Sequence, residues 1–449
     1  MKRVSHGRLF VGVTSAVALA AIDASLPSAT AAQQDFGTTA FVNVHVIPMD
    51  ADRILRNHTV IVRHGRIVDI GPASMVSVSP DAVQIDGSGK FLMPGFAEMH
   101  GHTPSGEFAE TVMFLYAANG VTTVRGMLGQ DGQLALKART NSGEIIGPTL
   151  YLAGPSFNGS SIRSPEQAAR RVRDQYDEGW DLLKVHPGLT RAEYDAMAIT
   201  AAEVGIRFGG HVPEDVGLIH AITMGQETFD HLDGFLQYAG GIDGPIDHGL
   251  LAQVIQMTKD ANAWVVPTMV LWERGIVGLG DISEMRASPE LKYWPARQVD
   301  GWTNRMERVQ QDPNFDIELA TAHARNRETV LKALSDAGVG ILMGTDSPQI
   351  FSVPGFSIHA EMEAMARAGM SPYEILKAGT KNVGEYFQAQ DSFGTVAIGR
   401  RADLILLNAN PLVDVRNAAE QAGVMLRGRW LSRETIDARL AEIVVEVGN

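Results

Sequence analysis

Two histidines separated by one residue form the first candidate for metal chemistry. They close the segment PGFAEMHGH, which spans residues 94–102 and places imidazoles at His100 and His102. Side chains alternate between the two faces of a strand, so both imidazoles point the same way. Such a pair at one strand end can chelate a cation, although an isolated His-x-His pattern is weak evidence by itself.

Four more residues with suitable chemistry end other short apolar segments: Lys184, His211, His231 and Asp346. The chain has no Cys, which excludes disulfides, Cys-based zinc sites and thiol nucleophiles. Any metal must therefore be held by His, Asp, Glu or a modified Lys. Imidazoles and a carboxylate gathered from several strand ends suit Zn²⁺ or a similar divalent cation.

Two nearby residues are candidate substrate contacts. His186 lies two positions after Lys184 and is expected on the same face of that strand, unless it is a structural histidine. Arg125 follows an apolar segment and could meet a substrate carboxylate. An ion pair with an acidic residue at the same rim is an equally good interpretation of Arg125.

The segments that carry these residues predict a (β/α)₈ barrel. Eight short apolar runs alternate with helix-like stretches, and eight is the strand number of that fold. The runs are 95–100, 121–124, 149–153, 182–186, 207–211, 227–231, 264–267 and 340–346. Barrel enzymes do their chemistry at the carboxyl ends of the strands, where the candidate residues fall. The barrel is expected over residues 93–389.

Two other regions flank or interrupt this pattern. Short β-branched segments in 35–92 and again in 390–449 predict one small β domain built from both chain ends. The connection over about 270–339 is far longer than a barrel needs. It holds Trp272, Trp294 and Trp302, and we expect part of it to line or close the substrate pocket, unless these side chains form its own core.

Charge and composition narrow the function classes. Lys plus Arg is 38 and Asp plus Glu is 52, a net charge of -14, so nucleic acid is not an expected partner. No G-x-S-x-G or G-x-x-x-x-G-K-[ST] pattern occurs, which disfavours elbow-type serine hydrolases and P-loop NTPases. The sequence leaves open whether the chain forms a homo-oligomer.

The first 31 residues have the pattern of a secretory signal peptide. A basic start is followed by an apolar run from Leu9 to Ile22 and by Ala29 and Ala31, spaced as in a cleavage site. The run is short for a membrane span of ~30 Å. We therefore expect cleavage near Ala31 or Ala32, a secreted or periplasmic location, and no membrane association after cleavage.

Together these motifs resemble the metal-dependent amidohydrolase superfamily. The resemblance is closest to its imidazolonepropionase-like and Xaa-Pro dipeptidase (prolidase-like) branch. It rests on the PGF…HGH segment, on GTDSP at residues 344–348 and on GTVAIGRRADL at residues 394–404. It covers nearly the whole chain after the signal peptide and implies a β-sandwich beside the barrel.

The resemblance also implies a site with two divalent metal ions, zinc being the expected metal. Its ligands would be His100, His102, Lys184, His211, His231 and Asp346. Lys184 would be carboxylated by CO₂, because an ammonium has only donors whereas a carbamate can bridge two cations. A metal-bridging hydroxide would attack the carbonyl, with Asp346 as general base and then acid.

The expected function is hydrolysis of an amide bond in a small molecule, such as a dipeptide or an N-acyl amino acid. Xaa-Pro dipeptidases and ochratoxin amidases are the implied parallels. The alternatives are a mononuclear imidazolonepropionase- or deaminase-type ring hydrolase, which Lys184 disfavours, and a lactonase or phosphotriesterase with the same metals. An inactive exported binding protein would have little reason to keep all six ligands.

Overall fold

Strands from the two ends of the chain hydrogen-bond into one mixed sheet of eight strands. A computed structural model describes residues 36–448, so the predicted signal peptide lies outside the described residues. The sheet follows the order β16-β15-β14-β5-β1-β2-β3, with β4 paired to β1. Its strands are β1 (Thr38–Val46), β2 (Leu55–Arg63), β3 (Arg66–Pro72), β4 (Val83–Asp86), β5 (Phe91–Pro94), β14 (Leu404–Leu407), β15 (Gln421–Leu426) and β16 (Arg429–Ser432).

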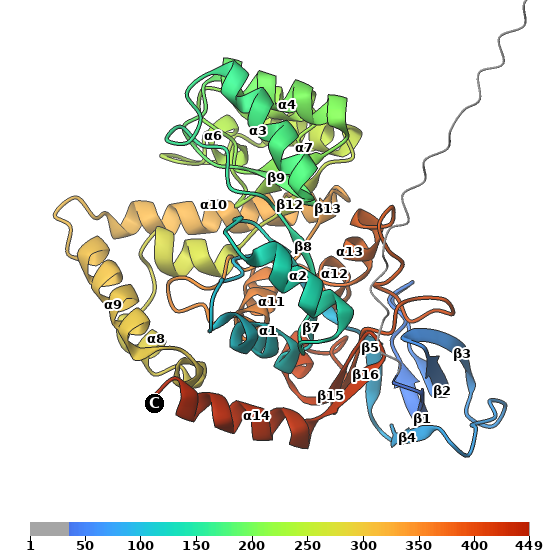
Figure 1. Cartoon of the computed structure of the whole chain (residues 1–449). Coiled ribbons are helices and arrows are strands. Elements are labelled where there is room, and N and C mark those ends of the chain that lie inside the picture. Colours follow the sequence, from blue (N-terminus) through green and yellow to red (C-terminus); the bar gives the residue numbers. More distant parts are fainter. Residues whose placement is uncertain (1–35, 449) are drawn as a thin grey trace, which may run out of the picture. The chain divides into compact units, whose positions relative to one another are not determined.

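The expectation of a β-sandwich is not confirmed. Strand β14 pairs antiparallel with β5, and this edge joins the carboxyl-terminal strands directly to the amino-terminal ones. The described strands of the two chain ends therefore share one hydrogen-bonded sheet, whereas a β-sandwich is built from two separate sheets. Figure 1 shows the blue amino-terminal strands beside the red β15 and β16.

Parallel strands occur at all eight predicted positions. One sheet contains β6 (Phe96–Gly101), β7 (Val121–Gly126) and β8 (Thr149–Leu152). The other contains β9 (Leu182–Val185), β10 (Arg207–Gly210), β11 (Thr228–Asp230), β12 (Trp264–Val266) and β13 (Gly340–Ile341). Backbone contacts run between the sheets: Ala153 bridges Leu182, and the Met99 amide donates to the Met343 carbonyl at 2.8 Å. The carboxyl ends of both sheets therefore face one region.

Helices follow most of these strands. They are α1 (Ala109–Ala118), α2 (Gln133–Ser142), α3 (Pro165–Glu178), α4 (Arg191–Val204), α5 (Leu218–Thr223), α6 (Phe235–Tyr238), α7 (His248–Asp260), α10 (Ile317–Asp336), α11 (Ser357–Arg367), α12 (Pro372–Ala378), α13 (Lys381–Tyr386) and α14 (Arg433–Glu446). Helices α4 and α12 begin with capping boxes, in which Thr190 and Ser371 are each paired to the Glu three residues on. Among the described residues, no helix is both long and apolar enough to cross a membrane.

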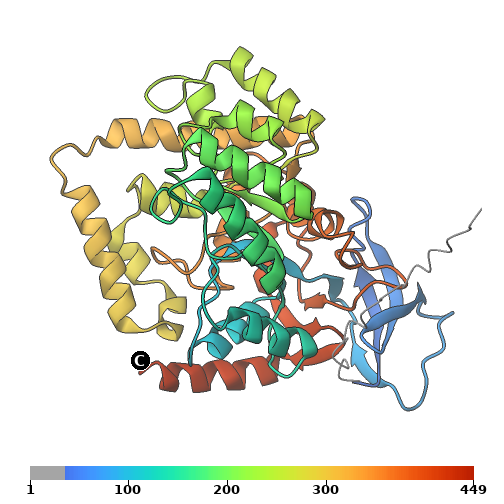
Figure 2. The same cartoon turned by 45° about the horizontal axis from the view of Figure 1, so that its top comes forward.

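The long connection after β12 forms an excursion before the chain returns in α10. The excursion contains a π-helical turn, η1 (Leu271–Ile276), then α8 (Ile282–Arg286), the 3₁₀ turn η2 (Pro289–Tyr293) and α9 (Ala296–Gln310). A second 3₁₀ turn, η3 (Val415–Ala419), precedes β15. In both views α8 and α9, in yellow, lie on the side away from the terminal sheet (Figures 1 and 2). The long connection thus contains helices of its own.

Candidate metal centre and active site

Five of the six predicted ligands surround one cavity of about 250 Å³ at the carboxyl ends of the strands. The cavity is lined by His100, His102, His186, His211, His231, Leu271, Trp272, Ile276, Asp346 and Gln349. The side chains come from segments as far apart as β6 and the loop after β13. The structure thus brings together residues that the sequence separates by almost 250 positions.

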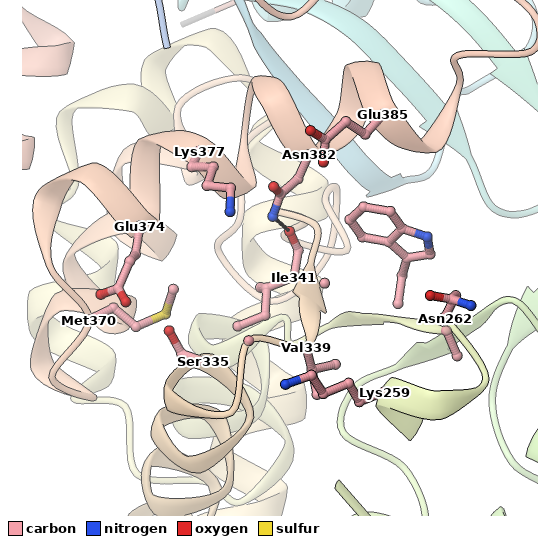
Figure 3. Close-up of a pocket in the computed structure, with 14 residues that line it drawn as sticks. Lys259, Asn262, Ser335, Val339, Ile341, Met370, Glu374, Lys377, Asn382 and Glu385 are labelled. Carbon is pink, nitrogen blue, oxygen red and sulfur yellow. Dashed lines mark hydrogen bonds between the residues drawn. The ribbon is translucent and has the colours of Figure 1, made fainter. Parts of the chain in front are cut away.

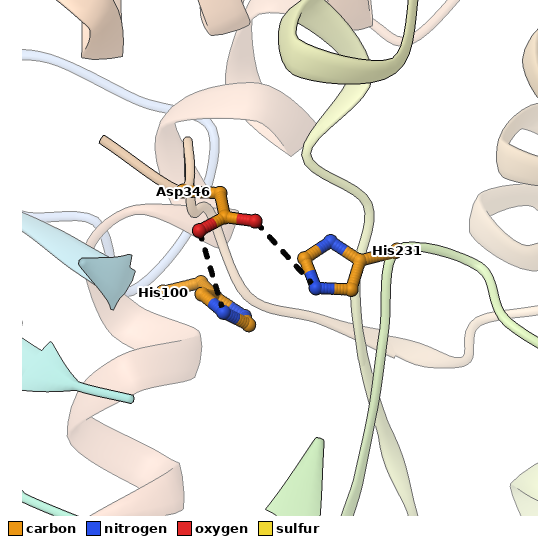
Figure 4. Close-up of side chains that lie close together, drawn as sticks. All are labelled: His100, His231 and Asp346. Carbon is orange, nitrogen blue, oxygen red and sulfur yellow. Dashed lines mark ion pairs between the residues drawn. The ribbon is translucent and has the colours of Figure 1, made fainter. Parts of the chain in front are cut away.

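Asp346 is the carboxylate at the centre of this group. Its Oδ1 lies 2.6 Å from His102 Nε2 and 3.7 Å from His100 Nε2. Its other oxygen lies 3.7 Å from His231 Nε2, and Figure 4 shows Asp346 between the rings of His100 and His231. Asp346 and His231 have φ values of 62° and 63°, a backbone conformation that is uncommon for residues other than glycine and clusters at functional sites.

Lys184 does not line the cavity but lies beneath His100. The side chain is fully buried, with its Nζ 3.1 Å from His100 Nε2 and 3.8 Å from Asp230 Oδ2. Burial lowers the pKa of Lys184, which the nearby carboxylates oppose. A desolvated lysine beside imidazoles is therefore available in its neutral form more readily than a surface lysine.

A buried ion pair supports His100 from the side away from the cavity. Asp230 Oδ2 lies 2.7 Å from His100 Nδ1, and Arg125 donates to both oxygens of Asp230 at 3.2 and 3.3 Å. Burial alone would raise the pKa of Asp230, but the charges of Arg125 and Lys184 hold that pKa below its usual range. A carboxylate at Nδ1 favours the tautomer with a lone pair on Nε2, the form that binds metals.

Arg125 therefore forms an ion pair with an acidic residue, which was the second of the two interpretations of this residue. Its guanidinium is completely buried and also donates to the Met99 carbonyl at 2.6 Å and to Thr228 Oγ1 at 2.9 Å. It is not among the residues lining the cavity. The structure shows the ion pair with a rim carboxylate and no contact surface for a substrate carboxylate.

Two other candidate histidine ligands, His211 and His231, are oriented in a similar way. Nδ1 of His211 lies 2.7 Å from Asp233 Oδ2, and Nδ1 of His231 lies 2.8 Å from Thr268 Oγ1. Each contact leaves Nε2 as the free nitrogen. In the described part of the chain, His231 Nε2 is buried with no hydrogen-bond partner. Burial keeps the pKa of His100 and His231 well below the usual range, so both imidazoles are neutral and can donate a lone pair.

These features fit a divalent cation. Donor atoms of His100, His231 and Asp346 all lie within 4.8 Å of one another, which is close enough for one ion to contact all three. An unpartnered buried imidazole nitrogen costs free energy unless something binds it. The donor set of imidazole nitrogens and a carboxylate oxygen suits zinc.

His186 lines the cavity, as a substrate contact must. Its ring stacks on that of His211 with centroids 5.0 Å apart. Burial lowers the pKa of His186 to about 2, so the imidazole is neutral at physiological pH. Its Nδ1 is buried with no hydrogen-bond partner among the described residues. A neutral ring with an unused nitrogen can hydrogen-bond a polar group of a ligand.

One of the three tryptophans of the excursion lines the pocket, and the other two pack within the excursion, so both expected roles occur. Trp272 lines the cavity, with its ring 6.4 Å from that of His231. Trp294 and Trp302 stack on each other with centroids 6.0 Å apart, and Trp294 also packs on Phe108. Only Trp272 lines the pocket, and the other two form part of the packing of the excursion.

Sequence reasoning missed Glu98 in the PGFAEMHGH segment. Its buried carboxylate accepts hydrogen bonds from the amides of His100 at 3.0 Å and Thr345 at 2.8 Å, and from Thr345 Oγ1 at 2.5 Å. Burial raises the pKa of Glu98 to about 8. Glu98 thus fixes the backbone of β6 and of the loop that carries Asp346. The available signal in the sequence was an acidic residue within a short apolar run, two residues before His100.

Comparisons with known proteins agree with this architecture. The solved structure of a Xaa-Pro dipeptidase with bound methionine superposes with a TM-score of 0.67 at 19% identity, covering 88% of this chain and 100% of that one. The solved structure of Aspergillus niger ochratoxinase superposes with a TM-score of 0.63 at 19% identity over 88% of this chain and 96% of that one. These likenesses define the fold as a TIM-like barrel with an added sheet domain.

The family follows from sequence comparison. The profile of the Amidohydrolase family matches residues 91–431, so the chain belongs to that family. An imidazolonepropionase from Arthrobacter sp. (strain FB24) is 24% identical over 428 residues, covering 87% of this chain and 100% of the relative. The chain is a hydrolase that acts on carbon–nitrogen bonds, as the sequence motifs predicted.

Proposed function

We propose that this protein is an exported amidohydrolase with two divalent metal ions that cleaves an amide bond in a dipeptide or an N-acyl amino acid. The arrangement around Asp346 carries the proposal: one carboxylate contacts three imidazoles above a buried lysine. The likeness to a Xaa-Pro dipeptidase and to an ochratoxinase favours amide substrates. Export rests on the amino-terminal sequence pattern alone.

The proposed metal ligands are His100, His102, Lys184, His211, His231 and Asp346. Lys184 would bridge the two ions as a carbamate. Its formation joins the neutral Nζ to the carbon of CO₂ with release of a proton, so the lowered pKa of Lys184 favours it. Two bound divalent cations would polarise the scissile carbonyl and promote ionisation of the attacking water near neutral pH.

The side chains have separate roles in this proposal. Asp346 takes a proton from the attacking water on a carboxylate oxygen and then delivers it to the leaving nitrogen. Its contact with His102 at 2.6 Å holds the carboxylate in the cavity. Asp230, Asp233 and Thr268 orient three of the imidazoles through their Nδ1 atoms. His186 offers a neutral hydrogen-bonding nitrogen to the substrate.

A ring hydrolase with one metal ion is the second candidate. The imidazolonepropionase relative favours it, because it aligns with 87% of the chain. The group of His100, His231 and Asp346 could by itself hold one ion. In this case Lys184 would remain an amine that hydrogen-bonds His100.

A substrate screen with metal analysis separates the candidates. Zinc-loaded protein is assayed with Xaa-Pro dipeptides, other dipeptides, N-acyl amino acids, a cyclic amide, a lactone and a phosphotriester, with Asp346→Asn as the inactive control. The proposal expects turnover of a linear amide and about two ions per chain. Turnover of the cyclic amide alone, with one ion per chain, would establish the ring hydrolase instead.

A further inference from the structure

The π-helical turn η1 supplies an apolar part of the cavity wall. Leu271, Trp272 and Ile276 from this turn line the cavity beside the histidines. Short π-helical segments are rare and occur frequently at functional sites. Trp272 is the largest of the three side chains, and its indole is the lining group with the greatest flat apolar surface.

Arg327 on α10 holds Trp272 from behind. The guanidinium carbon lies 4.3 Å from the centroid of the Trp272 ring, a cation–π contact. The same guanidinium donates to the carbonyls of His231 at 2.6 Å and Pro267 at 3.2 Å. Arg327 is only 3% exposed, so this contact is protected from solvent. One side chain thus ties the aromatic wall to a candidate metal ligand.

Glu361 on α11 holds the start of the same turn. Its carboxylate accepts the backbone N–H groups of Met269 at 2.7 Å and Val270 at 2.9 Å, and it is completely buried. The turn is therefore fixed from α10 and from α11. Because this part of the cavity wall is already ordered before a ligand binds, it selects ligands by their shape.

We propose that Trp272, positioned by Arg327 and Glu361, makes the enzyme prefer substrates with a planar, uncharged group next to the scissile bond. This inference rests on the proposed amide hydrolysis for its substrate type. The flat face of an indole stacks on a planar ring better than on a saturated ring of similar size. The described residues that line the cavity include no Lys or Arg that could pair with a negatively charged ring.

The kinetic test uses matched substrates. N-benzoyl-alanine is compared with N-cyclohexanecarbonyl-alanine, and N-acetyl-phenylalanine with N-acetyl-cyclohexylalanine. In at least one pair, wild-type kcat/KM should favour the planar ring by about threefold to tenfold. Trp272→Leu should abolish this ratio mainly through KM, with unchanged metal content. Arg327→Lys should reduce the ratio, because lysine has no planar group to stack on the indole.

A binding test works without turnover. Acetophenone and cyclohexyl methyl ketone carry the same two ring types on a carbonyl with no C–N bond to cleave. The zinc-loaded wild type should bind acetophenone more tightly, and Trp272→Leu should bind both ketones equally. The control Trp302→Phe changes a tryptophan of the excursion that does not line the cavity. It should keep the wild-type ratio of kcat/KM values and the wild-type ratio of ketone affinities.

The outcomes separate the two proposals. Two results would overturn this inference whatever the enzyme hydrolyses. One is that the wild type binds the two ketones equally, and the other is that Trp272→Leu keeps the wild-type ratio of ketone affinities. Failure to cleave any linear amide, with the ketone preference intact, would instead refute the proposed function and leave the aromatic wall established.

Discussion

The two ends of the barrel strands carry cavities that differ more in chemistry than in size. At the amino ends of β12 and β13 lies a cavity of about 350 Å³ (Figure 3). Its polar and aromatic lining residues are Lys259, Asn262, Trp264, Ser335, Glu374, Lys377, Asn382 and Glu385. The cavity at the carboxyl ends is smaller, about 250 Å³. Cavity volume alone would therefore favour the amino ends of the strands, away from the candidate ligands.

The polar side chains of the two cavities differ in their hydrogen-bond partners and in their burial. At the amino ends Lys259 is exposed and donates to the Ala337 carbonyl at 2.7 Å, and Asn382 donates to the Ile341 carbonyl at 2.8 Å. These contacts satisfy the backbone at the end of α10 and in β13. At the carboxyl ends His100, Lys184 and His231 are buried and aimed at one another. Buried titratable groups that converge mark the reactive end.

Replacing Lys184 should have the largest effect. Lys184→Ala should lose one of about two metal ions and nearly all activity, because it removes the amine that the proposal converts into an anionic ligand of both ions. Acetate or propionate should partly restore both by taking the place of the carbamate. Metal content is measured by elemental analysis, with Lys259→Ala as the matched control at the other end. One ion in the wild type, retained with full activity in Lys184→Ala, would contradict the two-metal proposal.

Asp346→Asn should leave most of the metal bound and lower kcat by about 10²–10⁴-fold, the usual contribution of a general acid–base group. The amide is nearly isosteric with the carboxylate but cannot accept the proton of the attacking water. Kinetics on the substrate found by the screen and metal analysis give the two readouts. Glu374→Gln, the same change of charge in the cavity at the amino ends, is the control. Wild-type turnover in Asp346→Asn would rule out the proton-transfer role.

Asp230→Asn tests the buried support of the metal site. The change leaves the Arg125 charge without its partner in a fully buried position, which costs about 3–5 kcal/mol of stability. It also removes the carboxylate at His100 Nδ1, so metal affinity should fall by about 10–100-fold. Urea denaturation and chelator competition measure the two effects. If affinity were unchanged while stability fell, the ion pair would serve the fold alone.

Local rules let the sequence predict which candidate ligands lie together. The alternation of side chains along a strand places His100 and His102 together, and strand ends in a barrel meet at one rim. The supporting partners depend on tertiary contacts instead. Arg125 and Asp230 are 105 positions apart, and the sequence around either residue does not show that the two form an ion pair.

Other features needed the structure for similar reasons. Short β segments at both chain ends predict a small β domain, but whether they form one sheet or two depends on edge pairing such as that of β14 with β5. The excursion was evident from its length, yet which tryptophan reaches the cavity depends on the π-helical turn at Leu271–Ile276. Propensity does not specify such turns, because neighbouring helices hold them in place.

The smallest effect is expected at the amino ends of the strands. The double variant Lys259→Ala/Lys377→Ala removes both lysines that line the larger cavity. Because Lys259 is exposed and Lys377 is half-buried, unfolding free energy should change by no more than about 0.5 kcal/mol per site. Metal content and kcat/KM should match the wild type, since neither side chain lines the cavity with the candidate ligands. Urea denaturation and kinetics check both expectations. A tenfold fall in kcat/KM at unchanged stability would show that the two ends are coupled through β12 and β13.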